Sequence, residues 1–133
     1  AGDCAAVRTS KGNYRRYETW QNAQAQGEVA GRNLGGGDAS FDIPVWFWSD
    51  QYEYKLQIVG LSQGYNEIVV REESPEQFSL WYFNNDTLLC VEAVNHAKAY
   101  VLGTQAIKQN IKVNKRILSD LATPLAKQHL LET

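Results

Sequence analysis

The chain has 133 residues, a formal net charge of −2 and a pI near 5.7, with 44% hydrophobic and 11% aromatic residues. This length allows a hydrophobic core, and the composition argues against disorder. No cluster of Lys or Arg exceeds a pair, so nucleic acid is not expected as a partner. No apolar run approaches the roughly 18 residues of a membrane span and no signal peptide is evident, so we expect no membrane contact and a cytoplasmic location.

The cysteine and histidine content gives little support for a metal site. Cys4 and Cys90 lie far apart without a Cys-x-x-Cys spacing, and His96 and His129 form no ligand pattern with them. Two buried free thiols are expected, and a disulfide is the alternative. Because the chain lacks methionine and begins abruptly with Ala-Gly-Asp-Cys-Ala, we expect a piece of a longer protein.

The N-terminal region predicts a loop followed by one helix. Residues 1–17 show no periodicity and carry a turn at Gly12-Asn13. From Thr19 to Leu34, apolar and small residues recur at spacings of three and four, with Thr19 as N-cap and Gly35-Gly36-Gly37 as the stop. One face consists of small residues, which permits close packing or the approach of a polar ligand to the helix end: Ala23, Gly27, Ala30 and Gly31.

The stretch Pro-Val-Trp-Phe-Trp-Ser-Asp-Gln-Tyr at 44–52 concentrates large rings just before a polar, strand-like run. Side chains alternate along a strand, so Trp46 and Trp48 share one face and Phe47 points to the other. Rings in such an arrangement can build a core or form a binding surface, and the stretch by itself leaves both open.

Period-two patterns after this stretch predict four strands joined by turns at 60–66, 74–75 and 84–86. The first places Tyr52, Tyr54, Leu56 and Ile58 on one face, and the others are Ile68–Arg71, Phe78–Phe83 and Leu88–Val94. Three consecutive connections of hairpin type favour an antiparallel sheet.

Helical patterns follow the strands. Asn95 is the expected N-cap of a helix whose buried stripe contains Ala97, Tyr100, Val101, Thr104 and Ile107. Short segments are expected at Ile117–Leu121 and, after Pro124, up to Leu131. Strands followed by helices predict an α+β domain over residues 42–133, a small antiparallel sheet with C-terminal helices, while residues 1–35 belong to something else.

Several motifs occur together in a fixed order: Gly-Asp-Cys-Ala at 2–5, Glu-Thr-Trp-Gln-Asn-Ala at 18–23, Trp-Phe-Trp-Ser-Asp-Gln-Tyr at 46–52, Leu-Gln-Ile-Val-Gly-Leu at 56–61 and Val-Asn at 94–95. Their combination resembles the C-terminal third of the FAD-dependent ferredoxin reductases that serve Rieske dioxygenases and cytochrome P450 systems, including putidaredoxin and rubredoxin reductases. The similarity runs from Gly2 to about Lys127. The resemblance implies that residues 1–35 end an FAD-binding domain and that 42–133 form the small domain covering the flavin. Neither the FAD nor the NAD fingerprint occurs in the chain.

The resemblance also implies roles for individual residues. Gly2 and Asp3 are expected to bind the FAD ribityl and pyrophosphate region. Trp20 is expected to place a helix start at the flavin pyrimidine, where the helix dipole stabilises negative charge; a core anchor is the alternative. Trp48 is expected to lie against the isoalloxazine, as cofactor contact and catalytic residue, and on the route to the ferredoxin. Trp46 and Arg32 are expected at the docking surface.

Three positions depart from the family pattern. Val45 separates Pro44 from Trp46, which affects the approach of the docking loop. The helix offers Glu28 before Arg32 where relatives carry a basic residue, which leaves the partner's charge open. His96 stands where relatives commonly have arginine.

The function implied by the resemblance is electron transfer from NADH through FAD to a small iron-sulfur ferredoxin or rubredoxin that feeds an oxygenase. The chain lacks the NADH site, so it is not expected to catalyse this reaction without the rest of its FAD and NAD domains. The alternative from another class is a non-enzymatic interaction module that binds a protein through the Trp46/Trp48 patch.

Overall fold

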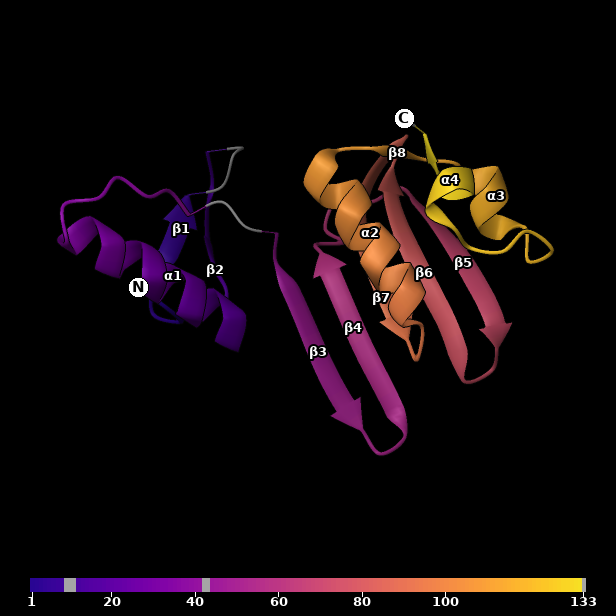
Figure 1. Cartoon of the computed structure of the whole chain (residues 1–133), viewed down its shortest axis with the longest axis horizontal. Helices are drawn as coiled ribbons and strands as arrows, with labels where there is room; N and C mark the ends of the chain where they lie inside the picture. The colour runs from indigo at the N-terminus through magenta and orange to yellow at the C-terminus, as the bar shows by residue number, and fades with distance from the viewer. Residues whose placement is uncertain (9–11, 42–43, 133) are drawn as a thin grey trace. The chain divides into compact units, whose positions relative to one another are not determined.

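The computed structural model describes residues 1–8, 12–41 and 44–132, which fall into two compact units, Ala1–Ile43 and Pro44–Thr133 (Figure 1). The sequence predicted a segment 1–35 and a domain 42–133. The structural division lies between residues 43 and 44, and positions 42 and 43 of the predicted domain fall outside the described residues.

Unit 1 contains a short hairpin and one helix. Strand β1 (Ala6–Arg8) pairs antiparallel with β2 (Tyr14–Arg16), so the prediction of a plain loop over 1–17 was wrong for these residues. The expected turn is present, and Gly12 in it has a φ of +82°. Helix α1 (Trp20–Leu34) begins after Thr19, whose hydroxyl accepts a hydrogen bond from the Asn22 N–H, and Gly35 is its C-cap. The helix prediction is confirmed, including its N-cap and its stop.

The small-residue face of α1 meets the Gly-Asp segment at Ala23, whose Cβ lies 3.7 Å from a Cβ built on Gly2, but the face is open at its two glycines. A Cβ built on Gly27 or Gly31 meets no heavy atom within 4 Å. The buried side chains of the helix are instead polar, namely Gln21, Asn22 and Gln26. Close packing of the small face is therefore seen at Ala23 but not at Gly27 or Gly31.

Unit 2 is built on one five-stranded antiparallel sheet in the order β3-β4-β7-β6-β5. Its strands are β3 (Trp46–Gln51), β4 (Tyr54–Gly60), β5 (Glu67–Ser74), β6 (Gln77–Asn84) and β7 (Thr87–Val94). The antiparallel sheet with C-terminal helices confirms the α+β prediction. One connection was wrong, because the chain crosses from β4 to the far edge at β5 and β4 pairs with β7. Tyr52, placed in a strand by its pattern, has a φ of +55° and lies in the turn before β4.

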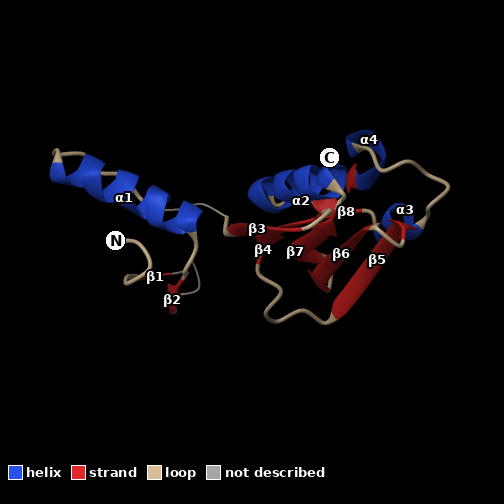
Figure 2. Cartoon of the chain, turned by 90° about the horizontal axis from the view of Figure 1, so that it is seen from below, coloured by secondary structure: helices blue, strands red, loops and turns tan. Residues whose placement is uncertain are grey.

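Helix α2 (Ala97–Gln109) packs on one face of the sheet, with α3 (Lys115–Ser119) and α4 (Lys127–Leu130) further along the chain (Figure 2). The short helices were expected; the small pair β8 (Lys112–Val113) and β9 (Leu131–Glu132) was not. On β4 the core residue is Val59, 1% exposed, opposite Val91 of β7. Leu56 and Ile58, which share the predicted apolar face of this strand, lie on the side of the sheet opposite Val59, because α2 covers the side of Val59.

The start of α2 and its buried stripe also differ from prediction. His96, not Asn95, is the N-cap residue, and Asn95 has a φ of +50°. The Asn95 amide instead links strands, since it accepts from the Lys55 N–H at 2.9 Å and donates to the Glu76 carbonyl at 3.0 Å. The buried residues of α2 are Ala99, Leu102, Gly103 and Ala106, while the predicted Val101 is 59% exposed.

Both cysteines are free, Cys4 exposed and Cys90 buried, so neither the disulfide nor the pair of buried thiols is present. The described residues contain no group of three His, Cys, Asp or Glu side chains arranged to hold a metal ion. Within the same residues, no helix combines the length and the apolar character needed to cross a membrane.

Candidate functional site

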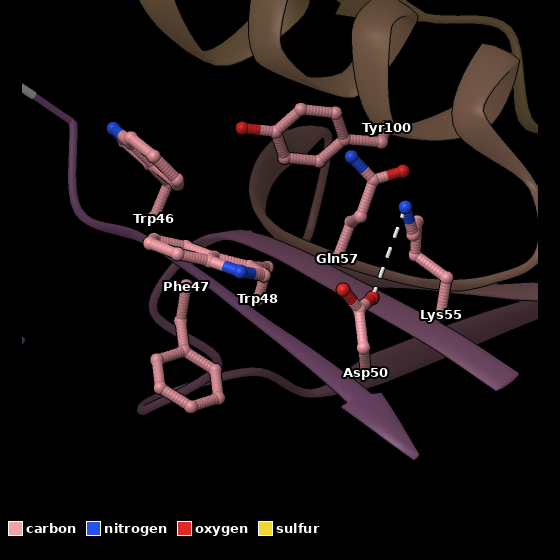
Figure 3. Close-up of a pocket in the computed structure, with 7 residues that line it drawn as sticks. All are labelled: Trp46, Phe47, Trp48, Asp50, Lys55, Gln57 and Tyr100. Atoms are coloured by element: carbon pink, nitrogen blue, oxygen red, sulfur yellow. Dashed lines mark ion pairs between the residues drawn. The ribbon is translucent and has the colours of Figure 1, made fainter. Parts of the chain in front are cut away.

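The aromatic stretch forms β3, which is an edge strand of the sheet because it pairs only with β4 in the strand order. Trp46 and Trp48 stack with ring centroids 5.2 Å apart and 29° between their planes. Phe47 points to the other face of the strand (Figure 3). Trp48 and Phe47 are each 43% exposed, whereas Trp46 is partly buried and packs against the core. One ring of the pair thus supports the domain and presents the other to solvent.

A shallow cavity of about 180 Å³ adjoins the tryptophan pair. Its lining comes from β3, β4 and α2, and consists of Trp46, Phe47, Trp48, Asp50, Lys55, Gln57 and Tyr100 (Figure 3). Pockets that enclose a drug-sized ligand usually measure about 300–1,000 Å³. This cavity is smaller, so we interpret it as part of the wall of a larger site and not as a complete small-molecule pocket.

The register between β3 and β4 places a charged pair beside the rings. Asp50 pairs with Lys55 across the two strands, and their side chains form an ion pair of 3.8 Å. Both side chains are more than half exposed, 57% and 60%. An exposed pair of this kind contributes little stability, about 0–1 kcal/mol. Its charges are therefore available to a partner at low cost.

The predicted Gly-Asp segment of unit 1 forms a turn against α1. Gly2 has a φ of +83°, and its N–H donates to Gln26 Oε1 at 2.9 Å. Gln26 Nε2 donates to Asn22 Oδ1 at 2.8 Å, and Asn22 Nδ2 donates to the Tyr17 carbonyl at 2.7 Å. Buried amides satisfied in this way hold the turn in one conformation.

Sequence reasoning missed the two amides that position the Gly-Asp turn. Asn22 and Gln26 are 1% and 5% exposed. Hydropathy assigns such residues to the solvent side, and their spacing of four was the only available signal, because side chains at i and i+4 meet on one helix face. The turn is therefore more strongly specified than its own residues indicate.

The remaining predicted residues of unit 1 are at the surface. Asp3 is exposed within the turn, Arg32 is exposed in the last turn of α1, and Trp20 is 66% exposed as the first residue of the helix. Trp20 is not a core anchor among the described residues. Gly2, Asp3 and Trp20 belong to unit 1, whereas Trp46 and Trp48 belong to unit 2. Their assigned roles stay predictions.

Residues 46–129 match the reductase C-terminal family, and the chain belongs to this family. It is 37% identical over 127 residues to the 5,5'-dehydrodivanillate O-demethylase ferredoxin reductase subunit of Sphingobium sp., covering 93% of this chain and 31% of the relative. It is 34% identical over 125 residues to the ferredoxin–NAD(+) reductase component of the p-cumate 2,3-dioxygenase system of Pseudomonas putida, covering 93% and 31%.

A solved structure of the covalent putidaredoxin reductase–putidaredoxin complex matches with a TM-score of 0.85 and 34% identity, covering 95% of this chain and 31% of that chain. The chain thus spans about 31% of the length of the relatives it matches. The resemblance read from the sequence motifs is confirmed. The match includes unit 1, since it extends over 95% of the chain.

Proposed function

We propose that this chain is the C-terminal portion of a cytoplasmic flavoprotein ferredoxin reductase, an enzyme that passes electrons from NADH through FAD to a small iron-sulfur ferredoxin or rubredoxin serving an oxygenase. The observation that carries the proposal is the exposed ring of Trp48, stacked on the partly buried Trp46 at a sheet edge of a reductase C-terminal domain. Relatives named as ferredoxin reductases match over both units. The chain on its own is not expected to catalyse the reaction, because its relatives are about three times as long.

The exposed residues fit FAD as the cofactor of the intact protein. The exposed ring of Trp48 provides a flat apolar surface for an isoalloxazine, and the exposed carboxylate of Asp3 can accept hydrogen bonds from hydroxyl groups. The N-terminus of α1, which starts at Trp20, favours negative charge. When bound, FAD takes a hydride from NADH and releases electrons one at a time. In this proposal Gly2 and Asp3 hold the cofactor's chain, and Trp20 and Trp48 adjoin its ring.

The partner-binding role is assigned to Trp46, Trp48 and Arg32. Large aromatic rings and arginine are the residue types that most often dominate protein interfaces. The charged side chains that line the cavity beside the tryptophan pair are Asp50 and Lys55, which form an ion pair with each other. We therefore expect the aromatic rings, and not a patch of one charge sign, to dominate the contact with the iron-sulfur partner.

The test uses the full-length reductase that contains this chain. Flavin absorbance is recorded first, followed by NADH-driven reduction of its ferredoxin for the wild type, Trp48→Ala and Phe47→Ala. Phe47 is the matched control, because it is an adjacent ring with the same exposed fraction, 43%, on the opposite face of β3. Interface tryptophans often contribute about 2 kcal/mol, so Trp48→Ala should slow electron delivery by roughly tenfold or more. Phe47→Ala should leave it within about twofold of the wild type.

The results distinguish a role of the tryptophan pair in electron transfer from a role in packing. Equal loss in both variants assigns the tryptophan pair to packing and removes its role in transfer. A wild type without flavin contradicts the reductase function, and the chain would then be a protein-interaction module that uses the Trp46/Trp48 patch.

A further inference from the structure

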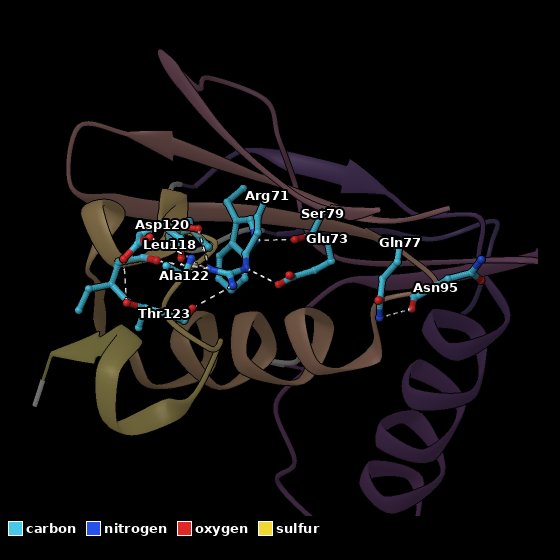
Figure 4. Close-up of polar contacts among 11 residues, drawn as sticks. Arg71, Glu73, Gln77, Ser79, Asn95, Leu118, Asp120, Ala122 and Thr123 are labelled. Atoms are coloured by element: carbon cyan, nitrogen blue, oxygen red, sulfur yellow. Dashed lines mark hydrogen bonds and ion pairs between the residues drawn. The ribbon is translucent and has the colours of Figure 1, made fainter. Parts of the chain in front are cut away.

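Arg71 is a buried cation in the middle of the edge strand β5. The residue is 1% exposed, and its Nε donates to Glu73 Oε1 at 2.6 Å. Its two terminal nitrogens donate to main-chain carbonyls of α3, Leu118 at 3.1 Å and Ile117 at 3.4 Å, and of the segment that follows α3, Asp120 at 3.1 Å and Thr123 at 3.0 Å (Figure 4). We call residues 120–125 of this segment the strap. Arg71 fastens the strap to β5.

The strap borders a cavity of about 550 Å³ at the start of α2. Strap residues Leu121, Pro124 and Leu125 line it together with Arg71, Glu73, Gln77, Asn95, His96, Ala97 and Lys98. His96 is 4% exposed, and its Nδ1 has no hydrogen-bond partner among the described residues. A buried polar atom without a partner is rare in native proteins and calls for a physical reason.

The charges around His96 come from two elements. Strand β5 supplies Arg71 and Glu73, and α2 supplies Lys98, while the strap side chains in the cavity are apolar. Burial lowers the pKa of His96 from its usual 6.5, and the positive charges of Arg71 and Lys98 act in the same direction against the opposing effect of Glu73. The imidazole is therefore held neutral at neutral pH.

We propose that His96 and Arg71 form a pH-sensitive latch, in which a neutral His96 allows the strap to close over the cavity and a protonated His96 releases it. The protonated ring carries an N–H on the buried Nδ1, which finds no acceptor among the residues that the structure describes, and a buried donor without an acceptor is unfavourable. It also adds a positive charge that competes with Arg71 for Glu73. Local opening of the strap removes both penalties because water then reaches the imidazolium.

The latch shares no residue with the proposed flavin and ferredoxin contacts, since Arg71, His96 and the strap line a cavity that contains neither Trp46 nor Trp48. Asp120 does not account for a change near pH 6. Its carboxylate accepts hydrogen bonds from the Thr123 hydroxyl at 2.8 Å and the Ala122 N–H at 3.0 Å. These bonds lower the pKa of Asp120 below its usual 3.8, so it stays ionised throughout the range in which a histidine titrates.

The test is amide hydrogen exchange of the 133-residue chain by NMR between about pH 5.5 and 7.5, with rates corrected for intrinsic exchange. The reporters are the strap amides of Ala122 and Thr123, and the reference is the core amide of Val91. If His96 returns to its usual pKa of 6.5 when the strap opens, strap protection should fall by about tenfold on acidification while core protection is retained. His96→Gln should remove this pH dependence. His129→Gln, at an exposed histidine of α4, should retain it.

Three outcomes overturn the latch. Strap protection that stays constant with pH in the wild type shows that protonation does not open the strap. Parallel loss in the strap and in Val91 shows global unfolding instead. Chemical shifts of the His96 ring nitrogens in the wild type decide the matter without any variant, because a ring that stays neutral while the strap opens cannot be the trigger.

Discussion

At Gly103, helix α2 lies close to strand β7 of the sheet. A Cβ built there would lie 2.5 Å from Val91 Cγ2 and 2.9 Å from Val91 Cβ. Val91 is 0% exposed, so its side chain has no free volume into which to move. Gly103→Ala therefore forces the helix and the sheet apart or drives Val91 out of its rotamer.

The expected loss follows from two opposing effects. Alanine is better than glycine in a helix interior by about 1 kcal/mol. Overpacking a buried contact typically costs about 1–3 kcal/mol, and a distance of 2.5 Å belongs at the upper end of that range. We expect Gly103→Ala to lower the free energy of unfolding of unit 2 by about 2 kcal/mol.

Urea unfolding followed by tryptophan fluorescence measures this loss, and a double-mutant cycle assigns its cause. Val91→Ala removes the two methyl groups that the new Cβ would meet. Val91→Ala and Gly103→Ala together should cost less than the sum of the single changes, by about 1–2 kcal/mol. Gly27→Ala is the matched control on α1, where a Cβ meets nothing within 4 Å. It should increase amide protection of that helix by an amount that corresponds to about 1 kcal/mol.

If Gly103→Ala leaves the free energy of unfolding unchanged or raises it, or if the effects of Gly103→Ala and Val91→Ala simply add, then α2 can shift away from the sheet without loss of stability. The assigned contact between Gly103 and Val91 would then not determine the distance between the helix and the sheet.

Two further outcomes are expected. Gly60→Ala should abolish cooperative folding, because Gly60 has a φ of +82° and a Cβ there would lie 2.0 Å from the Leu89 carbonyl oxygen. Gly64→Ala is the control, because Gly64 has a φ of +89° but open space around it, and it should lower the free energy of unfolding by only about 1–2 kcal/mol. Circular dichroism should distinguish the two variants. Burial raises the pKa of Cys90 to about 12 from the usual 9.0, so the unfolded state ionises first and the free energy of unfolding falls as pH rises above about 9. Cys90→Ala should flatten this decline in urea titrations under reducing conditions, and an unchanged slope between pH 8 and pH 10 would contradict the assignment.

Local patterns were sufficient to predict most of the elements. Thr19 and the three glycines bounded α1, since capping and left-handed turn conformations depend on neighbouring backbone groups. Alternation located β5, β6 and β7, and the Trp-Phe-Trp motif marked the residues of the candidate site, whereas the place of β3 at the sheet edge follows only from the strand order. These features depend on residues a few positions apart, and such interactions are expressed directly in the sequence.

Only the tertiary structure decided which face of each strand is buried and which strands pair with each other. Leu56 and Ile58 have the stronger apolar signal on β4, but Val59 is buried because α2 covers its side of the sheet. The order that joins β4 to β7 depends on a crossover, and a turn sequence does not show which strand follows it in space.

The buried polar clusters also form only in the tertiary structure, because their members come from separate segments. Asn22 and Gln26 hold the Gly-Asp turn, and Arg71 and His96 meet at the strap, although each of these residues reads as a surface position in the sequence. The sequence by itself determined most of the elements, the family and the concentration of aromatic residues at 46–48. Only the tertiary structure decided which polar groups are buried together, because burial of a hydrogen-bonding group depends on partners that lie far away along the chain.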